Sequence, residues 1–229
     1  MTIGLFGGTF DPVHVGHLDV ARAARRAAGL DVIWLVPSHV PPHRRPPHAS
    51  AAHRFAMAAL AAASTEGVLV SDLEMDAPGP SYTAHTLDRV ASRGYDLGKT
   101  SFVIGADAFR DIATWRDYPH VLERCHFVVV SRPGIPAAGL RDALPDLSAR
   151  MIDAPCEPPS RPSILLVDAL TSPVSSTDVR RAIRDGAPLE GLLPPAVARH
   201  IERHGLYREP GGRRESGKEP HEDIVTPAS

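Results

Sequence analysis

Short apolar runs alternate along the chain with longer segments in which apolar residues recur every three or four positions. The short runs predict buried strands at residues 3–6, 32–36, 68–70, 101–104, 127–130 and 164–167. The longer segments predict helices at 16–28, 50–64, 81–92, 175–184 and 195–204. Strands that alternate with helices are typical of βαβ units. The pattern therefore predicts an α/β fold, with a Rossmann-like doubly wound parallel sheet flanked by helices in a single domain.

Two segments break this pattern. Residues 37–48 are rich in proline and histidine, which predicts an exposed loop whose histidines His39, His43 and His48 face solvent. From about Arg208 the chain is rich in glycine, proline and charged residues. Such a composition buries too little apolar surface to pack. We therefore expect one domain over residues 1–207 and a disordered C-terminal tail over 208–229.

Composition narrows the class of protein. Apolar residues make up 43% of the 229 residues and the net charge is −2, so a core is expected and a nucleic-acid partner is not. A run of about 18 apolar residues is absent from the sequence, so no membrane association is expected. Cys125 and Cys156 lie far apart, and apolar strand residues begin by Ile3. These features predict a cytoplasmic protein without disulfides or a signal peptide, and they leave the oligomeric state open.

Two glycines and two histidines surround the first predicted strand–helix junction. Gly7 and Gly8 follow the strand, and a turn without β-carbons lets backbone N–H groups approach a phosphate. His14 and His17 are three positions apart at the start of the helix, which places both imidazoles on one face. The helix N-terminus adds unpaired N–H groups and the positive end of its dipole. The segment predicts a clamp for a phosphate that gains charge in a transition state.

Each feature has another interpretation when taken alone. A glycine pair after a strand is also typical of a plain turn, and this pair does not form a GxGxxG pattern. A histidine pair also occurs in metal sites, but a third His, Cys or Glu does not follow at the spacing of zinc hydrolases. Phosphate is therefore favoured over metal, and no metal ligand is expected.

The segment GGTFDPVHVGHL resembles the HxGH signature of the nucleotidyltransferase α/β-phosphodiesterase superfamily, and bacterial nicotinate-nucleotide adenylyltransferases in particular. The resemblance extends from about Ile3 to Tyr207. It implies an enzyme that transfers AMP from ATP to nicotinate mononucleotide, giving nicotinate adenine dinucleotide (deamido-NAD) and pyrophosphate in NAD biosynthesis. Mg²⁺ would arrive with ATP and be held mainly by phosphates and water.

A second motif opens the predicted helix at 175–184. Ser175, Ser176 and Thr177 place hydroxyls and N–H groups at the helix start, and Arg180 is one turn further on. An ordinary N-cap explains serine and threonine here equally well. The segment is similar to the SSTxxR motif of the family, which implies that these four residues bind the ATP phosphates.

A third segment, SYTAHTL at 81–87, resembles the SYTxxTL element of the family. The resemblance implies acceptor contacts from Tyr82, Thr83 and Ala84, where helix N–H groups would favour a nicotinate carboxylate. It also implies that Trp115 stacks on the pyridine ring. The alternatives are a helix cap and, for the tryptophan, core packing.

The resemblance also implies further nucleotide contacts just after strands. These candidates are Gly7, Gly8, Thr9, Phe10, Gly105, Asp107 and Arg132. Arg44 stands where the family often has a lysine that reaches the phosphates, so it is a candidate for catalysis and for the acceptor site. Because arginine changes the geometry, Arg45 is an alternative. Asp11 is at most an outer-shell contact of the cation.

These residues suggest a mechanism without a general base, because the acceptor phosphate is already an oxyanion. His14 and His17 would hold the α-phosphate, while Arg180 and Arg44 would help to hold the β- and γ-phosphates. Rival interpretations are other adenylyltransferases, which use nicotinamide mononucleotide or pantetheine phosphate, and cytidylyltransferases. A nucleotide-binding regulator without turnover and a metal-dependent hydrolase are rivals of other classes.

Overall fold

The computed structural model describes residues 1–40, 46–76, 79–156 and 159–208. Its strands are β1 (Ile3–Gly8), β2 (Val32–Pro37), β3 (Val68–Val70), β4 (Thr100–Gly105), β5 (His126–Val130), β6 (Met151–Asp153) and β7 (Ile164–Val167). Its α-helices are α1 (Val15–Ala27), α2 (Ala51–Ala63), α3 (Thr83–Ser92), α4 (Ala106–Phe109), α5 (Leu140–Ala143), α6 (Ser176–Arg184) and α7 (Pro195–Arg203). Short 3-10 helices occupy Leu97–Lys99, Ile112–Thr114, His120–Glu123 and Pro145–Arg150.

The strands form one seven-stranded sheet in the order β3-β2-β1-β4-β5-β7-β6, and every pair is parallel. This confirms the predicted doubly wound α/β fold. The order reverses between β1 and β4, because the chain first builds outward to β3 and then returns to the other side of β1. In sheets of this kind ligands bind beyond the carboxyl ends of the strands at such a reversal.

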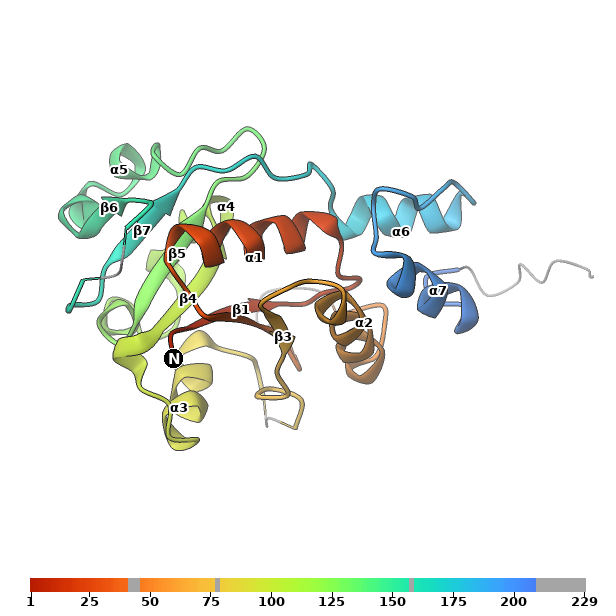
Figure 1. The fold of residues 1–229 in the computed structure, drawn as a ribbon, viewed down its shortest axis with the longest axis horizontal. Coiled ribbons are helices and arrows are strands. Elements are labelled where there is room, and N and C mark those ends of the chain that lie inside the picture. Colours follow the sequence, from red (N-terminus) through yellow and green to blue (C-terminus); the bar gives the residue numbers. More distant parts are fainter. Residues whose placement is uncertain (41–45, 77–78, 157–158, 209–229) are drawn as a thin grey trace, which may run out of the picture.

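Apolar residues pack on both faces of the sheet. One core combines the apolar sides of α1, α2, α6 and α7 with residues such as Phe6 and Ile33. The other combines α3, α4 and α5 with residues such as Leu5 and Phe127. Successive residues of a strand point to opposite faces, so a strand buried on both sides reads as a continuous apolar run. Figure 1 shows α6 and α7 together at the opposite end of the molecule from β6 and α5.

Each predicted strand and helix matches one of the structure to within two residues at each end, and three strands or α-helices were missed, as were the 3-10 helices. The sequence pattern did not predict β6 or the one-turn helices α4 and α5. β6 is a three-residue strand at the edge of the sheet, where it pairs with β7, and its exposed Asp153 interrupts the apolar pattern. Among the described residues, helices with the length and apolar character needed to cross a membrane do not occur.

Candidate active site

In the loop from β1 to α1, the ring of Phe10 packs against Phe6 of β1 and His17 of α1. Phe10 has a left-handed backbone with φ of 49° and a buried side chain. Its ring packs edge-on against Phe6 at 5.7 Å and against His17 at 5.0 Å between centroids. A β-carbon on Gly8 would come within 2.9 Å of the Phe10 ring, so glycine is needed at the strand end. The strained loop is thus held in place by packing.

His14 is the N-cap residue of α1, and His17 lies in the first turn of that helix. Their ring centroids are 3.7 Å apart, with planes 31° apart. The backbone N–H of His14 donates to Nδ1 of His17 at 3.2 Å. In the neutral ring the proton of His17 is therefore on Nε2, which makes that nitrogen a donor. A β-carbon on Gly16 would lie 3.0 Å from the Ser172 carbonyl oxygen. The glycine of HVGH therefore allows the backbone at Ser172 to approach the start of α1 closely.

His14 is neutral at pH 7 in the folded protein. Burial and the positive charge of Arg132 lower its pKa from 6.5 to about 4. Only 3% of the residue is exposed, and no hydrogen-bond partner of its Nδ1 is found within the part of the chain that the structure describes. A buried ring nitrogen without a partner beside a cavity is a candidate contact for a ligand.

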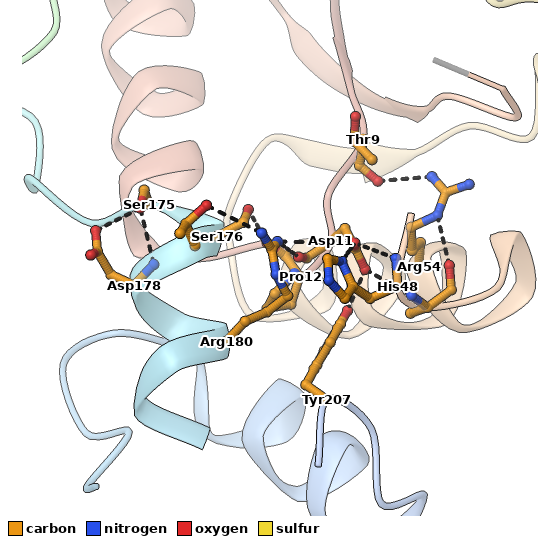
Figure 2. A network of polar contacts seen from close by, with 12 residues as sticks. Thr9, Asp11, Pro12, His48, Arg54, Ser175, Ser176, Asp178, Arg180 and Tyr207 are labelled. Carbon is orange, nitrogen blue, oxygen red and sulfur yellow. Dashed lines mark hydrogen bonds and ion pairs between the residues drawn. The ribbon is translucent and has the colours of Figure 1, made fainter. Parts of the chain in front are cut away.

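The start of α6 is hydrogen-bonded to the loop between β1 and α1, which lies more than 160 residues earlier in the sequence (Figure 2). Ser175 caps the helix by accepting from the N–H of Asp178 at 3.1 Å. Ser176 Oγ donates to the carbonyl of Pro12 at 2.9 Å. Arg180 donates through Nη1 to the carbonyl of Asp11 at 2.6 Å and through Nη2 to Thr177 Oγ1 at 3.1 Å. The helix starts of α1 and α6 consequently face one region.

A cavity of about 670 Å³ lies between these two helix starts. Both histidines, Arg180, Ser175, Ser176 and Thr177 line it. It is therefore bordered by two helix N-termini, which favour anions, and by several side-chain donors.

A second cavity of about 570 Å³ adjoins the first. The two share residues at their common border: Thr9, His17, Asp107, Arg132 and Ser176. Each is of a size that holds a small ligand. Together they can hold two reactants with His17 at the junction.

The second cavity contains most of the predicted acceptor residues. Tyr82 is the N-cap residue of α3, Thr83 begins that helix, and both line the cavity. Trp115 lines it as well and is half-buried, with its ring edge-on to Phe102 at 6.0 Å. Ala84 does not line the cavity: its side chain is buried and its carbonyl accepts from Arg124 at 2.9 Å.

The remaining predicted residues fall into three groups. Gly7, Gly8, Phe10 and Gly105 line the second cavity. Arg132 Nε lies 3.7 Å from Asp107 Oδ1, and both residues line the two cavities. Arg44 and Arg45 lie outside the described residues, so their roles stay predictions.

Several residues at the site were not predicted. The prediction that His39 faces solvent was wrong, because this residue is half-buried. His48 is exposed as predicted, but it also lines the first cavity. His43 lies outside the described residues. Buried Glu74 lines the second cavity, where its carboxylate accepts a hydrogen bond from the hydroxyl of Thr86, a residue of the SYTAHTL segment. Contacts of this kind depend on tertiary structure and leave no local sequence signal.

Comparison with known proteins shows which family the chain belongs to. The cytidylyltransferase-like family model matches residues 5–182. Proteins from Roseiflexus sp. and Thermus thermophilus, each named probable nicotinate-nucleotide adenylyltransferase, are 40% identical to this chain. The first match covers 90% of this chain and 98% of the relative, and the second covers 91% and 100%.

Solved structures show the same fold. The nicotinic acid mononucleotide adenylyltransferase of Plasmodium falciparum, described in complex with NaAD, superposes with a TM-score of 0.68 at 18% identity. The match covers 90% of this chain and 96% of that one. The chain belongs to the cytidylyltransferase-like family and, within it, to the nicotinate-nucleotide adenylyltransferases.

Proposed function

We propose that this protein transfers AMP from ATP to nicotinate mononucleotide, giving nicotinate adenine dinucleotide and pyrophosphate. The main support is the pair of adjoining cavities that meet at His17. The first offers two helix N-termini and Arg180 to a polyphosphate, and the second offers an indole and a helix start to a smaller aromatic anion. The names of the relatives at 40% identity support the same reaction.

The reaction joins an acceptor phosphate oxygen to the α-phosphorus of ATP. As this bond forms, the bond from the α-phosphorus to the oxygen bridging to the β-phosphorus breaks, and its electron pair leaves with pyrophosphate. No proton must be removed from the nucleophile, because it is already an oxyanion. The protein contributes alignment of the two substrates and stabilisation of the growing negative charge.

His17 and His14 are placed to act on the α-phosphate. His17 would donate from Nε2, because its Nδ1 accepts the His14 backbone N–H at 3.2 Å. Neutral His14 would donate from a ring nitrogen and would add no net charge. The α6 start with Arg180 would receive the β- and γ-phosphates, with help from Arg44.

Mg²⁺ would accompany ATP and offset part of the phosphate charge. The described residues contain no group of three His, Cys, Asp or Glu side chains placed to hold a metal ion. Phosphates and water would therefore supply most of the ligands of the cation. The outer-shell role of Asp11 stays a prediction.

At the acceptor site, Trp115 would stack on the pyridine ring and the N–H groups at the start of α3 would receive the nicotinate carboxylate. The enzyme would act in the cytoplasm without nucleic-acid or membrane partners. Cys125 and Cys156 are both free thiols, which fits a reducing compartment.

The test is pyrophosphate release with ATP and Mg²⁺, comparing nicotinate mononucleotide, nicotinamide mononucleotide and pantetheine phosphate as acceptors. The proposal expects a strong preference for nicotinate mononucleotide. Preference for another acceptor would retain adenylyl transfer and reject the pocket assignment. A chain that bound ATP but released no pyrophosphate with any acceptor would instead be a regulator.

A further inference from the structure

Asp11 is a buried carboxylate at which three distant parts of the chain meet (Figure 2). Its Oδ1 accepts from the Ala49 backbone N–H at 3.0 Å and from the Tyr207 hydroxyl at 2.8 Å. Its Oδ2 accepts from the His48 backbone N–H at 2.7 Å. Only 6% of the side chain is exposed, so these bonds are shielded from water.

Asp11 also lies against the phosphate-binding side of the site. Nη1 of Arg180 is 4.0 Å from its Oδ2 and donates to its backbone carbonyl at 2.6 Å. His48, which the carboxylate holds by its N–H, lines the same cavity as Arg180, together with the preceding prolines Pro46 and Pro47. A change in the position of the Asp11 carboxylate would therefore alter two walls of the first cavity.

Arg54, which is only 1% exposed, fixes the backbone on the other side of Asp11. Its guanidinium donates to the carbonyls of Thr9 at 2.8 Å, Ser38 at 2.7 Å and His39 at 3.2 Å. It also donates to the carbonyl of Ala49 at 3.3 Å. Two side chains contact the Asp11 carboxylate from elsewhere in the chain: the exposed His48 imidazole, whose Nδ1 lies 3.3 Å from Oδ2, and the Tyr207 hydroxyl. The Tyr207 contact can be removed by deleting a single oxygen atom.

Tyr207 follows α7, and its backbone adopts a left-handed φ of 65°. Such a conformation persists in a residue other than glycine where the surroundings hold it. Burial, followed by the negative charge of Asp11, raises the pKa of the tyrosine well above its usual value. The hydroxyl thus keeps its proton and donates to Asp11 throughout the physiological pH range.

We propose that Tyr207 is a positioning residue for the polyphosphate of ATP. Its hydroxyl orients the Asp11 carboxylate, which in turn places the His48 segment and the Arg180 guanidinium at the first cavity. The inference rests on the proposed function for the identity of the ligand. It concerns ATP rather than the acceptor, because Asp11 lines the first cavity and is not among the residues of the second.

The experiment compares Tyr207→Phe with Tyr95→Phe, which loses the same atom at a half-buried ring packed edge-on to Trp34. We expect the KM for ATP to rise about tenfold in Tyr207→Phe, since a hydrogen bond to a buried charge is lost. The KM for nicotinate mononucleotide and the kinetics of Tyr95→Phe should stay at wild-type values. A purely structural role would lower Tm without changing the KM for ATP, and that outcome would overturn the inference.

A second variant covers the case in which Tyr207→Phe folds poorly. Asp11→Asn should raise the KM for ATP in the same way, and the double variant should be no worse than the more severe single variant. If the increase in the KM for ATP in the double variant equalled the product of the two single increases, the two residues would act independently and the inference would be rejected.

Amide hydrogen exchange provides a readout that does not depend on turnover. The amides of His48 and Ala49 should exchange faster in Tyr207→Phe than in wild type or Tyr95→Phe. Unchanged exchange would reject the coupling through Asp11 whatever the activity. If wild-type protein released no pyrophosphate but the amides still responded, the proposed function would fail while the coupling stood.

Discussion

The rings of His14 and His17 lie 3.7 Å apart, and the backbone N–H of the first donates to Nδ1 of the second at 3.2 Å. This one bond fixes which nitrogen of His17 carries the proton in the neutral ring. It makes Nε2 the donor at the border of the two cavities. The sequence motif predicted that the two histidines share a helix face. It did not predict the hydrogen bond between them, because that bond depends on how the loop before the helix folds.

His17→Ala should lower kcat by about 10²- to 10³-fold, the usual effect of removing a donor to a charge that grows in the transition state. The KM for ATP should change little, because helix starts and Arg180 remain. His120→Ala is the control, since His120 is an exposed histidine that lines neither cavity. Near wild-type turnover in His17→Ala with intact substrate binding would contradict the proposed mechanism.

His14 should make the folded protein less stable in mild acid. Its folded pKa of about 4 is below the ordinary 6.5, so the unfolded chain binds the proton more tightly. The stability contributed by the neutral ring is complete above pH 6.5 and is lost as the pH falls toward 4. From pH 7.5 to pH 4.5 the loss is about 2 to 3 kcal/mol.

Urea unfolding of wild type and His14→Asn at these two pH values measures this contribution. Between the two pH values, the free energy of unfolding should fall by about 2 to 3 kcal/mol less in the variant than in wild type, because the variant lacks the His14 contribution. An equal fall in both proteins would show that another group causes the acid sensitivity.

Trp115→Ala should raise the KM for nicotinate mononucleotide about tenfold, because a stacking surface is lost from the second cavity. The KM for ATP should remain unchanged. Trp115→Phe preserves a flat aromatic face and should restore most of the affinity. Equal effects on both substrates would indicate that the ring supports the fold rather than the acceptor.

Removing the C-terminal tail tests the predicted domain boundary. A chain that ends at Arg208 keeps Tyr207 and its bond to Asp11, so its kcat/KM should remain within about twofold of wild type. Steady-state kinetics on the shortened and full chains provides the comparison. A large loss would assign the tail a role that its composition did not predict.

The fold was largely predictable because its signals are local. Buried strands such as β5 appear as apolar runs, and helices such as α1 carry apolar residues at helical spacing. β6 was missed because three edge residues, one of them a charged aspartate, do not make a recognisable run.

The candidate site was predictable only where motifs mark it. Gly7–His17 and Ser175–Arg180 carry chemical groups at helix starts, and the structure brings both segments to one cavity. Tyr207 and Arg54 lie outside these motifs, and their roles depend on bonds across 196 and 45 residues of sequence. No sequence pattern of a single chain encodes such pairings.

The most direct test of the central claim follows a label from the α-phosphorus of ATP in a reaction with Mg²⁺ and nicotinate mononucleotide. Adenylyl transfer predicts that the label appears in nicotinate adenine dinucleotide while the released pyrophosphate is unlabelled. Label recovered only in ATP, or in free AMP without any dinucleotide, would contradict the account.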